Sequence, residues 1–233
     1  MALEHKQLFF SKEAKIFANL WHSMVTTAQL ATKSHGEFNL MLSGGNTPLR
    51  FYKYILENEN LEQIDWPKVN IFFSDERHVA QNSAENNFKN AYDNFLKNLA
   101  CKNIFAFNTE LKPEAAAKQM SEVTLKHFNL KNEQTPIFDF CFLGFGPDGH
   151  FASIFPDTTN IDNAEICSAY YVKKLEMWRL TFNLTVFKHA TELCFIVAGT
   201  EKKTLLNNLG KRARALPIDY LAKENNVTWL ILQ

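Results

Sequence analysis

The sequence lacks an excess of charge of either sign, because 25 lysine and arginine residues balance 25 aspartate and glutamate residues. A chain without a basic surplus is not expected to bind nucleic acid or an anionic membrane through its overall electrostatic field. Any affinity for an anion must therefore come from a local site.

Cysteine is also scarce, and its four copies lie far apart in the sequence. They are Cys101, Cys141, Cys167 and Cys194. No C-x-x-C pair and no cluster of cysteine and histidine has the spacing of a metal site, so no bound metal is expected.

Long apolar runs are absent as well. No segment reaches the roughly 20 apolar residues that a transmembrane helix needs, and the N-terminal sequence MALEHKQLFFSKEAK has no apolar stretch typical of a signal peptide. The sequence therefore predicts a cytoplasmic protein without a membrane partner. Because internal repeats and Pro/Ser-rich linkers are missing, we expect one domain over residues 1–233, and a monomer is the default expectation.

What is present is an alternation of strand-like and helix-like segments. Hydrophobic residues make up 46% of the 233 positions, enough to bury a sizeable core. The predicted strands are 8–10, 38–42, 69–73, 104–107, 138–143, 166–172, 179–184, 193–197 and 227–232. The predicted helices are 12–35, 48–56, 86–99, 113–127, 200–209 and 216–223. This alternation predicts an α/β fold, in which helices cover both faces of a mainly parallel sheet.

Glycine is scarce too, with eight copies, yet three of them fall in one turn that follows an apolar strand. They are Gly144, Gly146 and Gly149, and the same turn carries Asp148 and His150. Loops at the carboxyl ends of strands bind ligands in α/β proteins, and a histidine there can transfer a proton near neutral pH. The turn therefore predicts a catalytic His150, with an ordinary strand-to-helix connection as the alternative.

A second glycine-containing turn, Ser-Gly-Gly-Asn-Thr-Pro, follows the second predicted strand. We expect Thr47 to be the N-cap of a helix whose first residue is Pro48. The free N–H groups and dipole of a helix start favour an anion. Gly44 and Gly45 would leave room for a phosphate, while Ser43 and Thr47 could add hydroxyl donors. Because the motif is neither a Walker A loop nor G-x-G-x-x-G, a tight turn with a capped helix is an equal alternative.

Three charged residues, Asp75-Glu76-Arg77, come directly after another apolar strand. Charges in this position usually form a solvated loop. At the carboxyl edge of a sheet, however, Arg77 could clamp a phosphate with two parallel hydrogen bonds. Asp75 or Glu76 could then orient Arg77 or bind a sugar hydroxyl.

Three more cationic residues lie at the starts of two predicted elements later in the chain. Arg179 starts a predicted strand, and Lys202 and Lys203 open a predicted helix. Lysine at a helix start opposes the helix dipole, so a ligand anion is one reason to place it there. Solvent exposure of at least one of the two lysines is the alternative.

Five motifs occur along the chain in the order LSGGNTP, SDERHV, FLGFGPDGHFASIFPDT, RLTFNL and VAGTEKK. In this order, and over nearly the whole chain, the sequence resembles the 6-phosphogluconolactonase family. The resemblance implies a Rossmann-like α/β fold shared with hexosamine-6-phosphate deaminases, ribose-5-phosphate isomerase and the CoA transferases. Glucosamine-6-phosphate deaminases typically carry Asp-Glu-Tyr at the position of Asp75-Glu76-Arg77, and their sequence after the histidine also differs.

The resemblance further implies hydrolysis of 6-phospho-D-glucono-1,5-lactone, without a cofactor. His150 would activate water as a general base, and Asp148 would orient His150 or contact a sugar hydroxyl. The phosphate would lie on the amides of the Gly-Gly turn, held by arginine and lysine side chains. The expected substrate-binding residues are Ser43, Gly44, Gly45, Thr47, Asp75, Arg77, Arg179 and Lys203.

Several alternatives stay open at this stage. A deaminase-like isomerase and a non-catalytic sugar-phosphate sensor are the competing functions, and a phosphorylated sugar lactone is the one expected partner. The oxyanion could be held by turn amides near Gly146 or Gly149. The sequence does not separate Lys202 from Lys203, nor a five-membered from a six-membered lactone.

Overall fold

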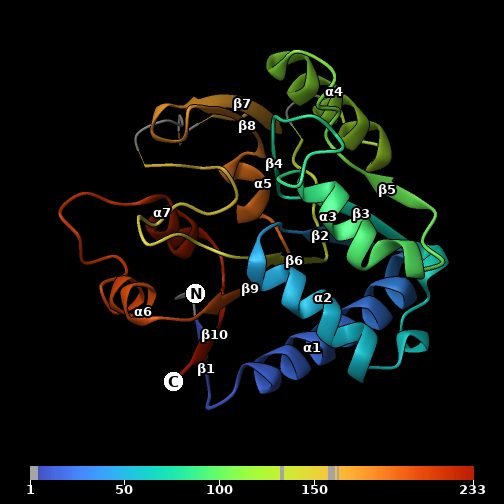
Figure 1. The fold of residues 1–233 in the computed structure, drawn as a ribbon, viewed down its shortest axis with the longest axis horizontal. Helices are drawn as coiled ribbons and strands as arrows, with labels where there is room; N and C mark the ends of the chain where they lie inside the picture. The colour runs from blue at the N-terminus through green and yellow to red at the C-terminus, as the bar shows by residue number, and fades with distance from the viewer. Residues whose placement is uncertain (1–4, 132–133, 157–160, 162) are drawn as a thin grey trace.

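The computed structural model describes residues 5–131, 134–156, 161 and 163–233. Its centre is a parallel sheet in the order β1-β10-β9-β6-β2-β3-β5, which crosses the molecule in Figure 1. The strands are β1 (Lys6–Phe10), β2 (Phe38–Leu42), β3 (Val69–Phe73), β5 (Asn103–Phe105), β6 (Phe140–Leu143), β9 (Glu192–Val197) and β10 (Thr228–Leu232). The prediction of a mainly parallel sheet is confirmed.

Helices cover both faces of this sheet, as predicted. Successive strand residues point to opposite faces, so Leu40 and Leu42 pack in one apolar cluster and Met41 packs in the other. The first cluster also contains residues of α1 (Glu13–His35), α2 (Asn46–Asn58) and α3 (Asn87–Asn94). The second contains residues of α4 (Pro113–His127), α5 (Leu184–Lys188), α6 (Thr200–Asn207) and α7 (Pro217–Glu224). None of the helices in the described ranges is long and apolar enough to cross a membrane.

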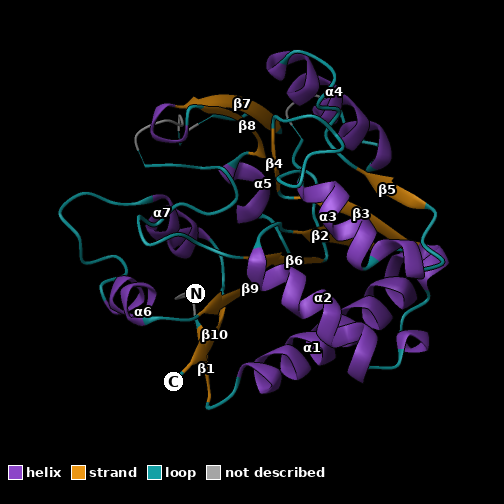
Figure 2. Cartoon of the chain, in the orientation of Figure 1, coloured by secondary structure: helices purple, strands orange, loops and turns teal. Residues whose placement is uncertain are grey.

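A second, smaller sheet was not predicted. Its strands are antiparallel in the order β4 (Asp75–Arg77), β8 (Met177–Phe182) and β7 (Cys167–Val172), and Figure 2 shows it beside α4 and α5. Of the two alternatives for Asp75-Glu76-Arg77, the solvated loop was wrong, because these residues form a strand that pairs with β8. The backbone N–H of Phe182 donates to the carbonyl of Ser74 (3.0 Å), which attaches this sheet to the end of β3.

Short 3-10 turns complete the described elements: η1 (Leu61–Gln63), η2 (Trp66–Lys68), η3 (Leu96–Asn98) and η4 (Lys173–Leu175). The last of these lies at the tip of the hairpin that joins β7 to β8. That tip supplies a lysine to the site described below.

The strand order places a ligand crevice between β2 and β6. On one side of this pair the chain proceeds through β3 and β5, and on the other through β9 and β10. In open α/β sheets, ligands bind outside the carboxyl ends of strands where the order reverses in this way. The two glycine-containing turns follow β2 and β6, so they meet at this point.

The helix after β2 begins earlier than predicted. Gly45, with φ of 100°, is the N-cap of α2, and no side chain caps the helix. The predicted N-cap at Thr47 was therefore wrong. Only glycine adopts such a φ without strain. Gly45 can therefore act as the N-cap, and the helix begins at Asn46, two residues before the predicted first residue Pro48. Pro48 fits because a proline in the first turn removes an N–H that has no partner inside the helix.

Candidate active site

A cavity of about 590 Å³ opens at the carboxyl ends of β2 and β6. It brings together nine of the ten site residues predicted from the sequence: Ser43, Gly44, Gly45, Thr47, Asp75, Arg77, Asp148, His150 and Arg179. Lys203 is not among the lining residues. A larger groove of about 830 Å³ lies between α4 and β7, and none of the predicted residues lines it.

His150 is held against Asp148 within the glycine turn. Its Nδ1 lies 2.5 Å from Asp148 Oδ1, and because an ionised carboxylate only accepts hydrogen bonds, we assign the Nδ1 proton to His150. This leaves Nε2 as the basic nitrogen. The ring also stacks on Phe155, with 4.3 Å between ring centroids. Two contacts therefore fix the imidazole.

Gly146 is required by the same arrangement. A Cβ added there would lie 2.2 Å from His150 Cε1 and 2.8 Å from Asp148 Oδ1. The turn amides are already engaged, because Gly146 N–H donates to the carbonyl of His150 (2.8 Å) and Gly149 N–H to the carbonyl of Gly146 (3.0 Å). The amides of Gly146 and Gly149 themselves are therefore not free for an oxyanion.

Asp148 also forms an ion pair with Lys174, which extends from η4 and lines the cavity. Burial favours a higher pKa for Asp148, but the hydrogen bonds from His150 and Lys174 outweigh it and hold that pKa well below its ordinary value. Asp148 therefore stays ionised. Lys174 belongs to none of the motifs recognised in the sequence. It reaches the cavity because it lies in the connection between β7 and β8 of the second sheet.

Asp75 lies in a network of hydroxyl groups. Ser153 Oγ donates to its Oδ2 (2.6 Å), and Ser74 Oγ donates to its Oδ1 (3.1 Å). Ser43 Oγ in turn lies 3.0 Å from Ser74 Oγ. The buried carboxylate therefore ties together the ends of β2 and β3 and the segment that follows His150.

Glu76 does not face the guanidinium of Arg77, although it is the neighbouring residue. Its carboxylate is buried and accepts backbone N–H bonds from Arg77 (2.8 Å), Asn87 (2.7 Å) and Phe88 (2.9 Å). Burial raises the pKa of Glu76 to about 7, against the lowering effect of these bonds. Glu76 therefore attaches β4 to the first turn of α3.

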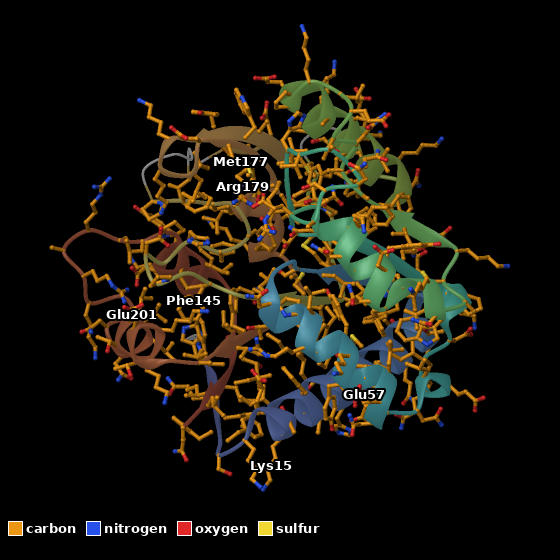
Figure 3. All side chains as sticks on the ribbon, viewed as in Figure 1. Lys15, Glu57, Phe145, Met177, Arg179 and Glu201 are labelled. Carbon is orange, nitrogen blue, oxygen red and sulfur yellow. The ribbon has the colours of Figure 1, made fainter. Side chains whose placement is uncertain are left out.

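Arg77 and Arg179 stand directly opposite each other in the β4–β8 pair. Arg77 Nη1 donates to the carbonyl of Glu85 (2.9 Å). Within the described part of the chain, neither guanidinium has an ion-pair partner. Arg179 Nε is buried without a hydrogen-bond partner. Figure 3 labels Arg179, which lies on β8 in the second sheet.

These features oppose the stability of the free protein. Burial is the largest effect and lowers the pKa of Arg179; Arg77 also lowers it, whereas the carboxylates of Asp75, Glu85 and Glu76 raise it. Like charges that face each other across a strand pair are destabilising. An anion bound between the two guanidinium groups would relieve both the repulsion and the unpartnered Nε.

Lys202, rather than Lys203, enters the cavity. Its Nζ lies 5.5 Å from the centroid of the Phe145 ring, and burial lowers its pKa. A helix places residues three and four apart on one face. Lys202 therefore shares a face with Leu205 and Leu206, which are both buried. That spacing was the signal in the sequence that could have separated the two lysines.

Asn87 was not predicted as a site residue, but it lines the cavity and is buried. A Cβ on Gly44 would lie 1.9 Å from Asn87 Oδ1, which has no hydrogen-bond partner. Asn87 Nδ2 donates to the carbonyl of Asp75 (3.0 Å). Gly44 is therefore needed to admit Asn87, in addition to the room it leaves for a ligand.

The charged lining carries a net positive charge on a chain that is neutral overall. The lining contains four cations and two carboxylates, so its net charge is +2 when His150 is neutral. The cations are Arg77, Lys174, Arg179 and Lys202, and the carboxylates are Asp75 and Asp148. Among the described residues, no three His, Cys, Asp or Glu side chains gather as a metal would require. The cavity thus combines a surplus of positive charge with a positioned imidazole.

Comparison with known proteins assigns the chain to a family. The family model described as glucosamine-6-phosphate isomerases/6-phosphogluconolactonase matches residues 11–229, so the chain belongs to this family. The chloroplastic 6-phosphogluconolactonase 3 of Arabidopsis thaliana is 32% identical over 211 residues, which cover 85% of this chain. The match spans 64% of that relative's length.

Solved structures agree on the fold. The 6-phosphogluconolactonase of Trypanosoma brucei superposes with a TM-score of 0.82 at 23% identity, covering 99% of this chain and 97% of that one. A monomeric glucosamine-6-phosphate deaminase superposes with a TM-score of 0.81 at 16% identity, covering 98% and 97%. Since both superpose equally well, the fold alone does not choose between the two activities.

Proposed function

We propose that this protein hydrolyses 6-phospho-D-glucono-1,5-lactone to 6-phospho-D-gluconate, the second step of the oxidative pentose phosphate pathway. The observation that carries the proposal is a single cavity that combines a His–Asp pair with a net charge of +2. A phosphorylated lactone carries its anion at one end and its reactive ester at the other. The family of the chain and the name of its Arabidopsis relative support the same reaction.

In the proposed mechanism His150 is the general base. Its Nε2 takes a proton from a water molecule while the water oxygen forms a bond to C1 of the lactone. The bond between C1 and the ring oxygen then breaks, and His150 returns the proton to that oxygen, which becomes a hydroxyl group. The new carboxylic acid loses its proton to solvent at neutral pH. General acid–base catalysis of this kind contributes roughly 10²- to 10⁴-fold.

Asp148 orients His150 in this scheme and stabilises the imidazolium that forms during the reaction. The hydrogen bond between Asp148 Oδ1 and His150 Nδ1 supports this role over a direct contact with the sugar. It keeps the proton on Nδ1 and leaves Nε2 free to accept one.

The phosphate is held at the other end of the cavity. We assign it to the guanidinium groups of Arg77 and Arg179, to Lys202, and to the first turn of α2 after Gly45. A phosphate there would meet unpaired N–H donors and the positive end of the helix dipole. Lys202 replaces Lys203 in the proposal. Binding energy from this remote group fixes C1 relative to His150.

Three predicted site residues act mainly through structure. Asp75 and Ser43 belong to the hydroxyl network that joins the strand ends, and Gly44 admits Asn87. Asp75 keeps unused lone pairs, since each carboxylate oxygen accepts more than one hydrogen bond. A sugar hydroxyl can therefore still bind to Asp75.

A coupled assay tests the proposed function. Glucose-6-phosphate dehydrogenase generates fresh lactone, and 6-phosphogluconate dehydrogenase reports the product. The protein is expected to accelerate the second signal above the spontaneous rate of lactone decay. Ammonia release from glucosamine 6-phosphate would favour the isomerase alternative instead. Binding of 6-phosphogluconate without any acceleration would favour a sensor.

The expected cytoplasmic location and monomeric state remain predictions. Every group in the proposed mechanism comes from one chain, which is compatible with a monomer. Light scattering after size-exclusion chromatography measures the mass, and 26.9 kDa is the mass of one chain.

A further inference from the structure

Lys174 stands out because the proposed mechanism does not use it, although it contacts the His–Asp pair. It lies in η4 at the tip of the β7–β8 hairpin, on the second sheet rather than on the parallel one. Its ammonium group forms an ion pair with Asp148 Oδ2 and lies 4.8 Å from the centroid of the Phe155 ring. The same Phe155 ring stacks on His150.

These contacts leave neither oxygen of Asp148 without a partner. Oδ1 accepts a hydrogen bond from His150 Nδ1 at 2.5 Å, and a longer one from the His150 backbone N–H at 3.3 Å. Oδ2 accepts one from Lys174. A carboxylate held only at Oδ1 could rotate about its Cβ–Cγ bond. The second anchor at Oδ2 fixes the plane of the carboxylate and, through it, the direction of the imidazole.

Lys174 also lies between the active-site cavity and a second cavity. Lys174, Asp148 and Phe155 line the active-site cavity and also a neighbouring cavity of about 430 Å³. Removing the lysine ammonium group would leave Asp148 Oδ2 without its protein partner, on a carboxylate that already lines the second cavity. Water would then compete for Oδ2, and Asp148 would hold the imidazole less firmly.

We propose that Lys174 is a positioning residue, which holds Asp148 so that His150 Nε2 points at the lactone carbon. Lys174 acts through Asp148 and does not bind the phosphate. This inference rests on the proposed hydrolysis, since it concerns the rate of the same chemical step. It also gives the second sheet a role in catalysis, because the β7–β8 hairpin delivers the lysine.

The chain supplies a matched control in the adjacent Lys173. Both lysines lie in η4 and are exposed. Lys173 does not line the active-site cavity, and no ion pair involves it within the described ranges. Lys173→Met therefore removes the same charge from the same turn and keeps a side chain of similar length, and kcat and KM are expected to stay within about twofold of wild type.

The test measures kcat and KM for lactone hydrolysis in Lys174→Met and Lys174→Arg. Loss of one hydrogen bond to a charged group is expected to lower kcat about tenfold in Lys174→Met, with KM within about twofold. Lys174→Arg keeps the ion pair and is expected to retain most of the wild-type kcat. The melting temperature should change little, because a half-exposed ion pair adds little stability.

A double-mutant cycle separates positioning from direct binding. Asp148→Asn removes the group through which Lys174 acts, so adding Lys174→Met to that variant should lower kcat by no more than about twofold. A tenfold further loss, or a rise in KM with unchanged kcat, would show that Lys174 binds the substrate itself and would overturn the inference. So would an unchanged kcat in Lys174→Met. An inactive wild type would refute the proposed function instead.

Discussion

The variant Arg179→Met is expected to bind the phosphorylated ligand more weakly and, at the same time, to fold more stably than the wild type. Arg179 faces Arg77 across the β4–β8 pair, and its Nε is buried without a partner. Methionine keeps much of the apolar stem while it removes the charge and the unpaired donor. Most substitutions destabilise a protein, so weaker binding together with a higher stability would be diagnostic.

The magnitudes follow from the contacts. Hydrogen bonds to a charged group contribute about 1.5–3 kcal/mol, so the loss of Arg179 should weaken binding of the phosphate roughly 10- to 150-fold. Relief of the repulsion between like charges across a strand pair contributes about 0.2–1 kcal/mol. Removal of the unpaired buried donor adds to this. We expect the free energy of unfolding to rise by roughly 1 kcal/mol, which corresponds to a gain of about 2–4 °C in melting temperature.

Two measurements check this prediction. Titration calorimetry with 6-phosphogluconate gives the dissociation constant, and urea unfolding without ligand gives the free energy of unfolding. Lys53→Met serves as the control, because Lys53 is an exposed cation on α2 whose one ion pair within the described residues is with Glu57 (3.6 Å). It should leave both quantities nearly unchanged. Unchanged binding together with lower stability in Arg179→Met would mean that the arginine is structural and that the anion site is wrongly placed.

Three further predictions concern the base, its turn and a buried carboxylate. His150→Ala should lower kcat roughly 10²- to 10⁴-fold while 6-phosphogluconate still binds; near-normal turnover would remove His150 from the mechanism. Gly146→Ala should lower kcat on the order of 100-fold, because its Cβ would displace the imidazole that it meets at 2.2 Å, and full activity would show that the ring can move without cost. The pKa of Glu76 is about 7 in the folded protein, against an ordinary value of 4.5, so the unfolded chain loses this proton first as the pH rises. The contribution of Glu76 to the free energy of unfolding should therefore fall by up to roughly 3 kcal/mol as the pH rises from 4.5 to about 7. Urea unfolding of wild type and of Glu76→Gln over this pH range measures the fall, and a difference between the two proteins that does not vary with pH would contradict the raised pKa.

The parallel sheet and its flanking helices could be predicted because each strand is a short apolar run followed by a turn signal and a helical pattern. The same logic predicted the location of the two glycine-containing turns, since parallel strands end at the same edge of a sheet. The order of the strands within the sheet could not be predicted in this way. That β2 lies beside β6 follows from the strand order, and no local pattern encodes that order.

The second sheet escaped prediction for a related reason. Asp75-Glu76-Arg77 is polar and only three residues long, and it becomes a strand solely because β8 pairs with it. Lys174 escaped for the same reason, since it reaches Asp148 across 26 residues through a hairpin that belongs to this sheet. Contacts that depend on such non-local pairing leave no periodic pattern in the sequence. The single-domain organisation stays a prediction.

The most direct test of the account follows C1 of freshly prepared, ¹³C1-labelled 6-phosphogluconolactone by carbon NMR, with wild type, with His150→Ala and in buffer alone. The account predicts that wild type converts the lactone signal to the carboxylate signal far faster than buffer does, and that His150→Ala falls back close to the buffer rate. A wild-type rate equal to that of buffer, or a variant as fast as wild type, would contradict it.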